Sequence, residues 1–304
     1  MRRQSLEAGA MRVLVTGGTG FIGAALCHAL TGAGHVVTVV ARDPEHVDGA
    51  AIGWEGVSAA VRESDALVNL AGEPLGSRRW SAPQKELIRQ SRVLATRTLV
   101  DAVAAAEPRP KVLVNASAVG YYGPRDDEAL DESAGPGTGF LADVCQAWEQ
   151  EALRAEELGL RVVRLRLGIV LAAHGGALAR MLPPFRAFVG GPIGSGGQWM
   201  SWIHRDDVTG LVVDALARDA YRGPVNATAP QPVTNRDFAS MLGRTLARPA
   251  WLPTPAFALR LALGEMAELL LTGQRVLPGV ANRFGYPWRY PELGGALRAS
   301  VRRR

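Results

Sequence analysis

The stretch RVLVTGGTGFIG, residues 12–23, decides the fold predicted for this chain. Its first five residues form a short apolar run that glycines end, which is typical of a buried parallel strand. Residues 21–31 have helical spacing and stop near Gly32 and Gly34, as helices often do. Glycines at such a turn permit a tight bend, close approach of backbone to a pyrophosphate, and close packing of helix on strand. The stretch therefore predicts a strand, a turn and a helix that together bind a dinucleotide.

The helix after this turn strengthens the prediction. Its free N–H groups and partial positive charge favour phosphate at the N-terminus. The residues of the turn expected to bind the cofactor are Gly17, Thr19, Gly20, Phe21, Ile22 and Gly23.

Arg42 indicates which dinucleotide is bound, because it follows the second expected strand, residues 36–41. A site that prefers NAD usually carries Asp or Glu here, to bind the ribose hydroxyls. A guanidinium instead pairs with a 2′-phosphate. Arg42 therefore favours NADP(H). Asp43 is one residue further on, and a shifted loop that presented its carboxylate would reverse this preference.

Strands and helices alternate after the glycine turn, which predicts an α/β fold with a doubly wound parallel sheet of the Rossmann type. Further strands are expected at 66–70, 112–116, 161–167 and 224–229, and helices at 82–106, 140–158, 205–218 and 235–246. Residues 256–271 are expected to form one amphipathic helix that packs on a core.

The glycine- and proline-rich segment 190–197 marks a change of composition. We assign residues 11–170 and 204–228 to an NADP(H)-binding Rossmann domain. Residues 171–203 and 229–300 are assigned to a smaller C-terminal substrate cap, and residues 1–10 to a leader. The substrate pocket is expected between the two parts, beyond the carboxyl ends of the strands.

The composition narrows the class of protein. The chain has 304 residues, of which 47% are hydrophobic and 21% charged, as in ordinary globular proteins. Its two cysteines, Cys27 and Cys145, have no neighbouring metal-ligand pattern, so we expect no metal and a cytoplasmic location. The net charge of +5 is scattered, so we expect no nucleic acid as partner. The absence of a long apolar run predicts no membrane span. We expect a small molecule as the substrate, and the composition is compatible with a homodimer.

Several motifs carry a resemblance to a known family. Val-Thr-Gly-Gly-Thr-Gly-Phe-Ile-Gly (15–23), Asp65-Ala-Leu-Val-Asn-Leu-Ala-Gly72 and Met200-Ser-Trp-Ile-His-Arg-Asp-Asp207 resemble segments of the extended short-chain dehydrogenase/reductases, the class of NAD-dependent epimerases and dehydratases. The chain is most similar to a largely uncharacterised epimerase-family subgroup also called cell-division-inhibitor-like. The motifs of that subgroup are Asn69-Leu-Ala-Gly-Glu73, Arg79-Trp80, Ser91-Arg92, Gly120-Tyr-Tyr-Gly123, Met181-Leu-Pro-Pro-Phe185, residues 190–196 and Gly273-Gln-Arg275.

The resemblance covers about residues 11–300 and implies further cofactor contacts. It places Leu70, Ala71 and Gly72 beside the cofactor at the end of the fourth strand motif. It also implies that Glu86 and Arg92 face the cofactor and that Val170 lines the nicotinamide side. On spacing alone, Glu86 and Arg92 are six residues apart on a helix and do not share a tight face.

The catalytic residues depart from the family pattern. Most of the superfamily uses a Ser or Thr, a Tyr, and a Lys four residues after the Tyr, whose charge favours the tyrosinate. In the expected helix, counting back from Glu149 places Cys145 at the Lys position and Leu141 at the Tyr position. The remaining catalytic candidates are Ser117, at the end of the fifth strand motif, and Tyr121.

Several other residues are expected to have structural roles or to leave their role open. Tyr122 shares the loop with Tyr121, where packing over the nicotinamide is an alternative to catalysis. His204 is expected to be a structural hydrogen-bonding group, Asp207 to cap the following helix, and Cys145 to be a small buried apolar residue. Trp199 and Trp202 line either a substrate pocket or a core.

Two functions remain open from the sequence. The first is an NADP(H)-binding oxidoreductase or epimerase-like enzyme that acts on a small molecule without the Tyr-xxx-Lys pair. The second is an NADP(H)-binding regulatory protein or pseudoenzyme without turnover, which the missing pair favours.

Overall fold

A seven-stranded parallel sheet forms the centre of the fold in the computed structural model, which describes residues 9–301. Most of the expected leader, residues 1–10, therefore lies outside the described residues. The strands are β1 (Arg12–Thr16), β2 (Val36–Val40), β3 (Ala51–Ile52), β4 (Ala66–Asn69), β5 (Val112–Ala118), β7 (Arg161–Leu167) and β11 (Gly223–Ala227). Their order is β11-β7-β5-β4-β1-β2-β3. The register places Thr16 beside Asn69 and Asn69 beside Asn115, so the carboxyl ends of the strands are level.

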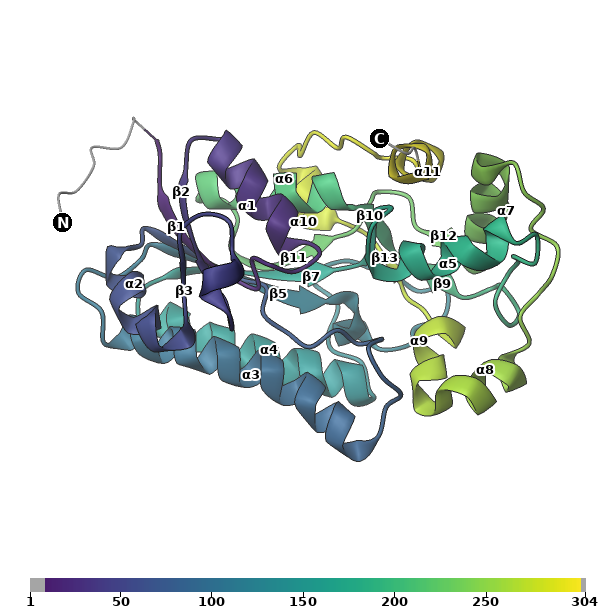
Figure 1. Ribbon diagram of the computed structural model, residues 1–304, viewed down its shortest axis with the longest axis horizontal. Helices are drawn as coiled ribbons and strands as arrows, with labels where there is room; N and C mark the ends of the chain where they lie inside the picture. The colour runs from purple at the N-terminus through teal and green to yellow at the C-terminus, as the bar shows by residue number, and fades with distance from the viewer. Residues whose placement is uncertain (1–8, 302–304) are drawn as a thin grey trace.

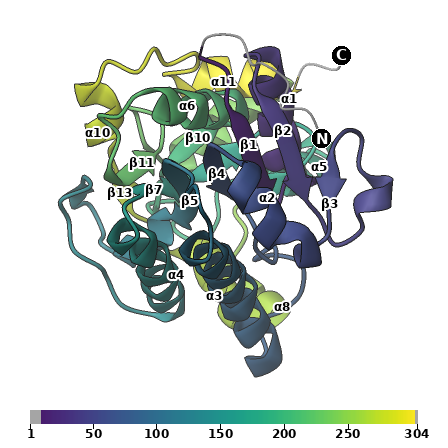
Figure 2. The same ribbon diagram turned by 90° about the vertical axis from the view of Figure 1, so that its left-hand side faces the viewer.

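Helices cover both faces of this sheet, as the alternating sequence predicts (Figures 1 and 2). One face is covered by α1 (Gly23–Gly32) and α6 (Arg205–Ala217), and the other by α2 (Val57–Glu63), α3 (Ala82–Ala104) and α4 (Phe140–Glu157). The alternation of side chains along β1 explains both layers. Val13 and Val15 pack in the cluster that contains the apolar face of α1, and Leu14 packs in the cluster of α3. The predicted doubly wound α/β fold is confirmed.

A smaller unit adjoins the carboxyl ends of the central strands (Figure 1). It contains β8 (Ile169–Leu171), α5 (Gly176–Arg186), β9 (Trp199–Met200), β10 (Trp202–His204), β12 (Val233–Thr234), α7 (Asn235–Leu246), β13 (Arg275–Val276) and α11 (Leu293–Val301). Leu182, Trp202 and Phe238 belong to its own apolar core. Two short parallel pairs lie outside the central sheet: β8 pairs with β10, and β13 pairs with β6 (Ala129–Leu130). The short helix α10 (Gly279–Arg283) packs near β11.

The prediction of one core-packed helix over residues 256–271 is wrong. The chain forms α8 (Ala256–Leu263), the 3-10 turn η4 (Gly264–Ala267) and α9 (Glu268–Leu271). Gly264 has a φ of +61°, a left-handed conformation that ends a helix. No side chain of α8 is buried, and Phe257 and Leu261 are 73% and 80% exposed. Apolar helical spacing therefore does not identify a core-facing helix here.

The described part of the chain, residues 9–301, contains no helix that is both long and apolar enough to cross a membrane. The remaining short elements are the 3-10 turns η1 (Pro44–His46), η2 (Trp54–Gly56) and η3 (Val119–Tyr122).

Candidate functional site

The glycine turn packs directly against the end of β4. Gly17 has a φ of +69°, and a Cβ atom placed on it would lie 2.6 Å from the carbonyl oxygen of Leu70. A Cβ atom on Gly23 would lie 2.1 Å from the carbonyl oxygen of Gly17. Both positions therefore require glycine. The contact brings the turn together with Leu70 and Ala71, two residues that the resemblance places at the cofactor.

The start of α1 is open to a ligand. Ile22 occupies the N-cap position and makes no side-chain cap hydrogen bond, and no acidic residue lies in the first turn. The N–H groups of a first helical turn need partners from outside the helix, and an anion satisfies them well. Thr19 and Gly20 are exposed beside this helix start. The geometry therefore fits the pyrophosphate of a dinucleotide.

Phe21 connects the turn to the smaller unit. Cβ atoms built on Gly175 and Gly176 would lie 2.3 Å and 2.9 Å from its ring, so the start of α5 contacts this ring closely. The Gly176 position also lies 3.1 Å from the carbonyl oxygen of Val170. The structure thus brings Val170 near Phe21 of the glycine turn.

Arg92 lies next to Gly72 without a carboxylate partner among the described residues. A Cβ atom on Gly72 would lie 3.0 Å from the guanidinium carbon of Arg92. The guanidinium donates to the carbonyl oxygen of Ile88 at 2.9 Å and lies over the Trp148 ring, 5.3 Å from its centre. Burial lowers the pKa of Arg92, because desolvation disfavours the charged form. A half-buried cation without an ion-pair partner among the described residues suits an anionic ligand at Gly72.

Arg42 and Glu86 are both exposed, at different places. Arg42 follows β2, whose end is level with the glycine turn. The neighbouring Asp43 carboxylate lies 2.9 Å from His46 Nδ1, and both side chains are largely exposed. Glu86 accepts a hydrogen bond from Gln90 and lines a depression of about 590 Å³ between α3, α4 and η4. It is not brought to the glycine turn by any contact of the described residues.

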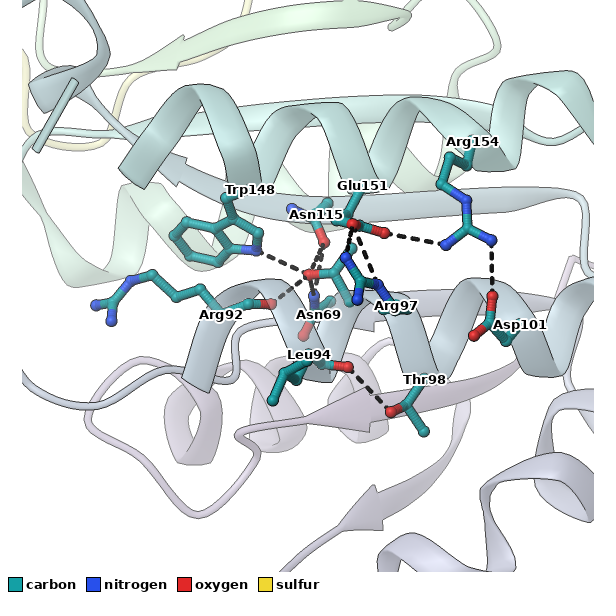
Figure 3. A network of polar contacts seen from close by, with 11 residues as sticks. Asn69, Arg92, Leu94, Arg97, Thr98, Asp101, Asn115, Trp148, Glu151 and Arg154 are labelled. Atoms are coloured by element: carbon teal, nitrogen blue, oxygen red, sulfur yellow. Dashed lines mark hydrogen bonds and ion pairs between the residues drawn. The ribbon is translucent and has the colours of Figure 1, made fainter. Parts of the chain in front are cut away.

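A buried polar network supports the strand ends beneath the turn (Figure 3). The Asn69 amide donates to Thr96 at 2.8 Å and to Asn115 at 2.6 Å, and its oxygen accepts from Thr16 at 2.6 Å. Trp148 Nε1 donates to Thr96 at 2.9 Å. Satisfied polar networks of this kind define one arrangement of a core. The sequence reasoning missed it, and its signal was an Asn within each of two buried apolar strands.

Ser117 is buried and its hydroxyl donates to Glu149 Oε1 at 2.7 Å. Glu149 is itself 2% exposed and receives both Nε (2.8 Å) and Nη2 (2.9 Å) of Arg166. Arg164 adds a third arginine contact at 3.1 Å. The Ser117 hydroxyl is therefore bonded within the core here. The ion pair between Glu149 and Arg166 was not predicted from the sequence, in which Glu149 served only to mark the helical register.

The two tyrosines of η3 differ in environment. Tyr122 is fully buried, donates to Asn226 at 2.7 Å and accepts from Arg166 at 2.9 Å, and burial raises its pKa. Tyr121 is half-buried, and the guanidinium carbon of Arg166 lies 3.5 Å from its ring centre. Tyr121 therefore keeps a partly accessible phenol on a ring that Arg166 holds, whereas Tyr122 is a core residue.

The positions that replace the family Tyr and Lys pack near η3. A Cβ atom on Gly120 would lie 3.2 Å from Leu141 Cβ and 3.9 Å from Cys145 Sγ. Cys145 is 4% exposed, and burial raises the pKa of its thiol to about 11. The expected role of Cys145 as a small buried apolar residue is confirmed. The described residues hold no group of three or more His, Cys, Asp or Glu side chains that could bind a metal.

The prediction that Asp207 caps α6 is wrong. His204 is the N-cap residue, and its Nδ1 accepts from the N–H of Asp206 at 3.1 Å. The Asp207 carboxylate instead accepts from the N–H groups of Arg289 (2.8 Å) and Tyr290 (3.0 Å), which ties the C-terminal segment to α6. Burial lowers the pKa of His204 to about 4, so the imidazole is neutral at pH 7 and accepts this hydrogen bond. Its expected structural role is confirmed.

Trp202 and Trp199 have different surroundings. Trp202 is fully buried in the core of the smaller unit. Trp199 is half-buried and donates to Asp127 at 2.6 Å. Trp202 is therefore a core residue and does not line a pocket. Trp199 lies at the junction between the two parts of the chain.

The fold and the glycine turn together define a dinucleotide-binding protein of the extended short-chain dehydrogenase/reductase type. The chain belongs to the NAD-dependent epimerase/dehydratase family, which matches residues 13–227, and residues 254–300 match a domain of unknown function, DUF1731.

Several individual proteins are similar over nearly the whole chain. The chloroplastic SDR39U1 homologue of Arabidopsis thaliana, an epimerase family protein, is 44% identical over 301 residues, which cover 95% of this chain and 86% of that protein. The crystal structure of human epimerase family protein SDR39U1 with NADPH has a TM-score of 0.89 at 38% identity, covering 95% of this chain and 99% of the other. The crystal structure of a nucleoside-diphosphate sugar epimerase from Corynebacterium glutamicum has a TM-score of 0.79 at 34% identity. The match covers 97% of this chain and 59% of the other.

Proposed function

We propose that this chain binds NADP(H) and acts as an oxidoreductase or epimerase-like enzyme on a small molecule. The observation that carries the proposal is the contact of Gly17 with Leu70, which joins the glycine turn and the strand-end motif at one edge of the sheet. A similar human protein was crystallised with NADPH, which supports the choice of cofactor. A cytoplasmic location and a small-molecule substrate belong to the same proposal.

Each binding residue has a separate task in this proposal. The N-terminus of α1 binds the pyrophosphate through its free N–H groups. Arg42 pairs with the 2′-phosphate, and Arg92 supplies a positive charge beside Gly72. Leu70, Ala71 and Val170 line the rest of the cofactor. Glu86, whose carboxylate accepts a hydrogen bond from Gln90, is assigned to the cofactor by the family resemblance alone.

Proton transfer is assigned to Tyr121. When bound, the nicotinamide would supply or accept a hydride. Tyr121 is the half-buried phenol near this edge, and Arg166 stacked on its ring orients it. Ser117 contributes indirectly in this arrangement, because its hydroxyl donates to the Glu149 carboxylate that holds Arg166. A contact of Ser117 with substrate requires that this hydrogen bond be exchanged.

Binding of NADPH and NADH, followed by cofactor fluorescence, tests the choice of cofactor. Arg42→Glu is expected to weaken NADPH binding by about 10- to 100-fold, since hydrogen bonds to charged groups contribute roughly 1.5–3 kcal/mol. NADH affinity should stay nearly constant or rise, since a carboxylate here can bind the ribose hydroxyls. The matched control is Arg62→Glu, an exposed arginine on α2. An equal loss in both variants, or none in either, would contradict the role of Arg42.

Oxidation of NADPH across a panel of carbonyl compounds separates the enzyme from the regulator. The regulatory alternative is favoured by Leu141 and Cys145, which lack acid–base chemistry at the family positions. Turnover in the wild type supports the enzyme, and tight binding without turnover supports the regulator. With turnover, Tyr121→Phe should lower the rate about 10²- to 10⁴-fold. An unchanged rate would remove Tyr121 from the mechanism.

A further inference from the structure

The segment Gly273-Gln-Arg275 is held against β9 and the following Ser201 by one close backbone contact and two hydrogen bonds of the Ser201 hydroxyl. A Cβ atom on Gly273 would lie 2.0 Å from the carbonyl oxygen of Trp199, so only glycine fits. The Ser201 hydroxyl donates to the carbonyl oxygen of Gln274 at 2.6 Å and accepts from the N–H of Val276 at 2.8 Å. β9 and β13 therefore lie side by side, near the junction of the two parts (Figure 1). These contacts fix the backbone at Arg275.

The guanidinium of Arg275 has no acceptor within residues 9–301. Its central carbon lies 4.9 Å from the centre of the Trp199 ring, and its Nε is buried without a hydrogen-bond partner. The nearby carboxylate of Asp127 is bonded to Trp199 Nε1 at 2.6 Å instead. A desolvated donor without an acceptor is unfavourable, and stacking on an aromatic ring offsets only part of that cost. Arg275 is thus a positioned cation that lacks an anion.

Arg275 is linked to Tyr121 through the next residue of β13. Val276, its neighbour on β13, packs in the cluster of Tyr122 and Leu130, and Tyr121 packs on the same cluster. Arg275 is therefore the chain neighbour of a residue in the apolar cluster on which Tyr121 packs.

We propose that Arg275 and Trp199 form an anion subsite, so that the substrate is a small molecule with a carboxylate or phosphate group. This inference rests on the proposed function, because it assumes that the substrate lies beside Tyr121. The planar guanidinium binds two oxygens of one oxyanion in bidentate fashion, which an ammonium does not. The indole of Trp199 holds the guanidinium in place and covers the uncharged part of the substrate.

The test uses the full chain saturated with NADPH, so that the cofactor site is filled before any anion is added. Inorganic phosphate, pyrophosphate and malonate are titrated by calorimetry, and the first two are compared with malonate to distinguish phosphate from carboxylate. Arg275→Met should weaken the preferred anion at least about 10-fold, equivalent to about 1.4 kcal/mol, with NADPH affinity unchanged. Arg275→Lys should recover only part of the affinity, since it keeps the charge and loses the bidentate geometry.

Arg248→Met is the matched control. Arg248 also lies over an aromatic ring, 4.4 Å from the centre of Phe188, but it is exposed and its Nε is not a buried, unpartnered atom. An equal loss of anion binding in this variant would attribute the effect to net charge and overturn the proposal. Unchanged binding in Arg275→Met, or no anion binding by the wild type, would also overturn it. Failure of the wild type to bind NADPH would refute the proposed function instead.

Discussion

Replacing Glu149 by Gln should be among the most destabilising single changes in this chain. The carboxylate is 2% exposed and accepts from Ser117, twice from Arg166 and once from Arg164. The amide of Gln removes the negative charge and points an NH₂ group at one set of donors. Breaking a buried ion pair on one side costs about 3–5 kcal/mol, because the remaining charge is left uncompensated. At about 2–4 °C per kcal/mol for chains of 150–250 residues, the melting temperature should fall by roughly 6–20 °C.

The assay is urea unfolding followed by circular dichroism, with Glu151→Gln as the matched control. Glu151 lies on the same helix and pairs with Arg97 and Arg154, whose side chains are 49% and 43% exposed. Exposed pairs contribute only about 0–1 kcal/mol. The double variant Glu149→Leu/Arg166→Met should be more stable than Glu149→Gln, because it removes both charges together. If Glu149→Gln costs no more than Glu151→Gln, the buried pair does not stabilise the fold as argued.

Two further predictions concern stability. Burial lowers the pKa of His204 from 6.5 to about 4. Between pH 6.5 and pH 4 the unfolded chain therefore binds more protons than the folded chain. The free energy of unfolding should fall as the pH falls through this range, by at most about 3 kcal/mol. His204→Asn keeps a helix-capping group and should lose this pH dependence, measured by urea unfolding at several pH values. If the free energy of unfolding changes equally with pH in both proteins, His204 is not the cause. Phe257→Ser, on exposed α8, should change the free energy of unfolding by less than about 0.5 kcal/mol. Phe238→Ala, in the cap core, should cost about 3–5 kcal/mol; similar costs would contradict the described exposure of α8.

The sheet and the glycine turn were predictable from the sequence because their signals are local. A buried strand needs an apolar run, and the helix after it needs a periodic apolar face. Gly17 and Gly23 are required by contacts within the turn and with the end of β4. The strand, turn and helix at residues 12–32, and the alternation that follows, therefore agree with the structure to within a few residues.

The break at Gly264 was less accessible to sequence reasoning. Glycine within an apolar helical pattern is tolerated in many helices, so spacing alone does not show that this one adopts a φ of +61°. Burial of the adjacent helix depends on which surface it meets, and α8 meets none that buries a side chain. Periodicity reports the amphipathic character of a segment and leaves its environment open.

The sequence by itself determined the family, the parallel sheet and the candidate cofactor turn. Only the tertiary structure decided which polar groups face one another. Tyr122 and Asn226 are 104 residues apart in sequence yet share a hydrogen bond, and Ser117 meets Glu149 from a different element. Such pairs depend on the packing of helices on strands, which no local pattern encodes. For the same reason, the glycine of Gly273-Gln-Arg275 could be recognised as a motif, but the unpartnered cation beside it required the fold.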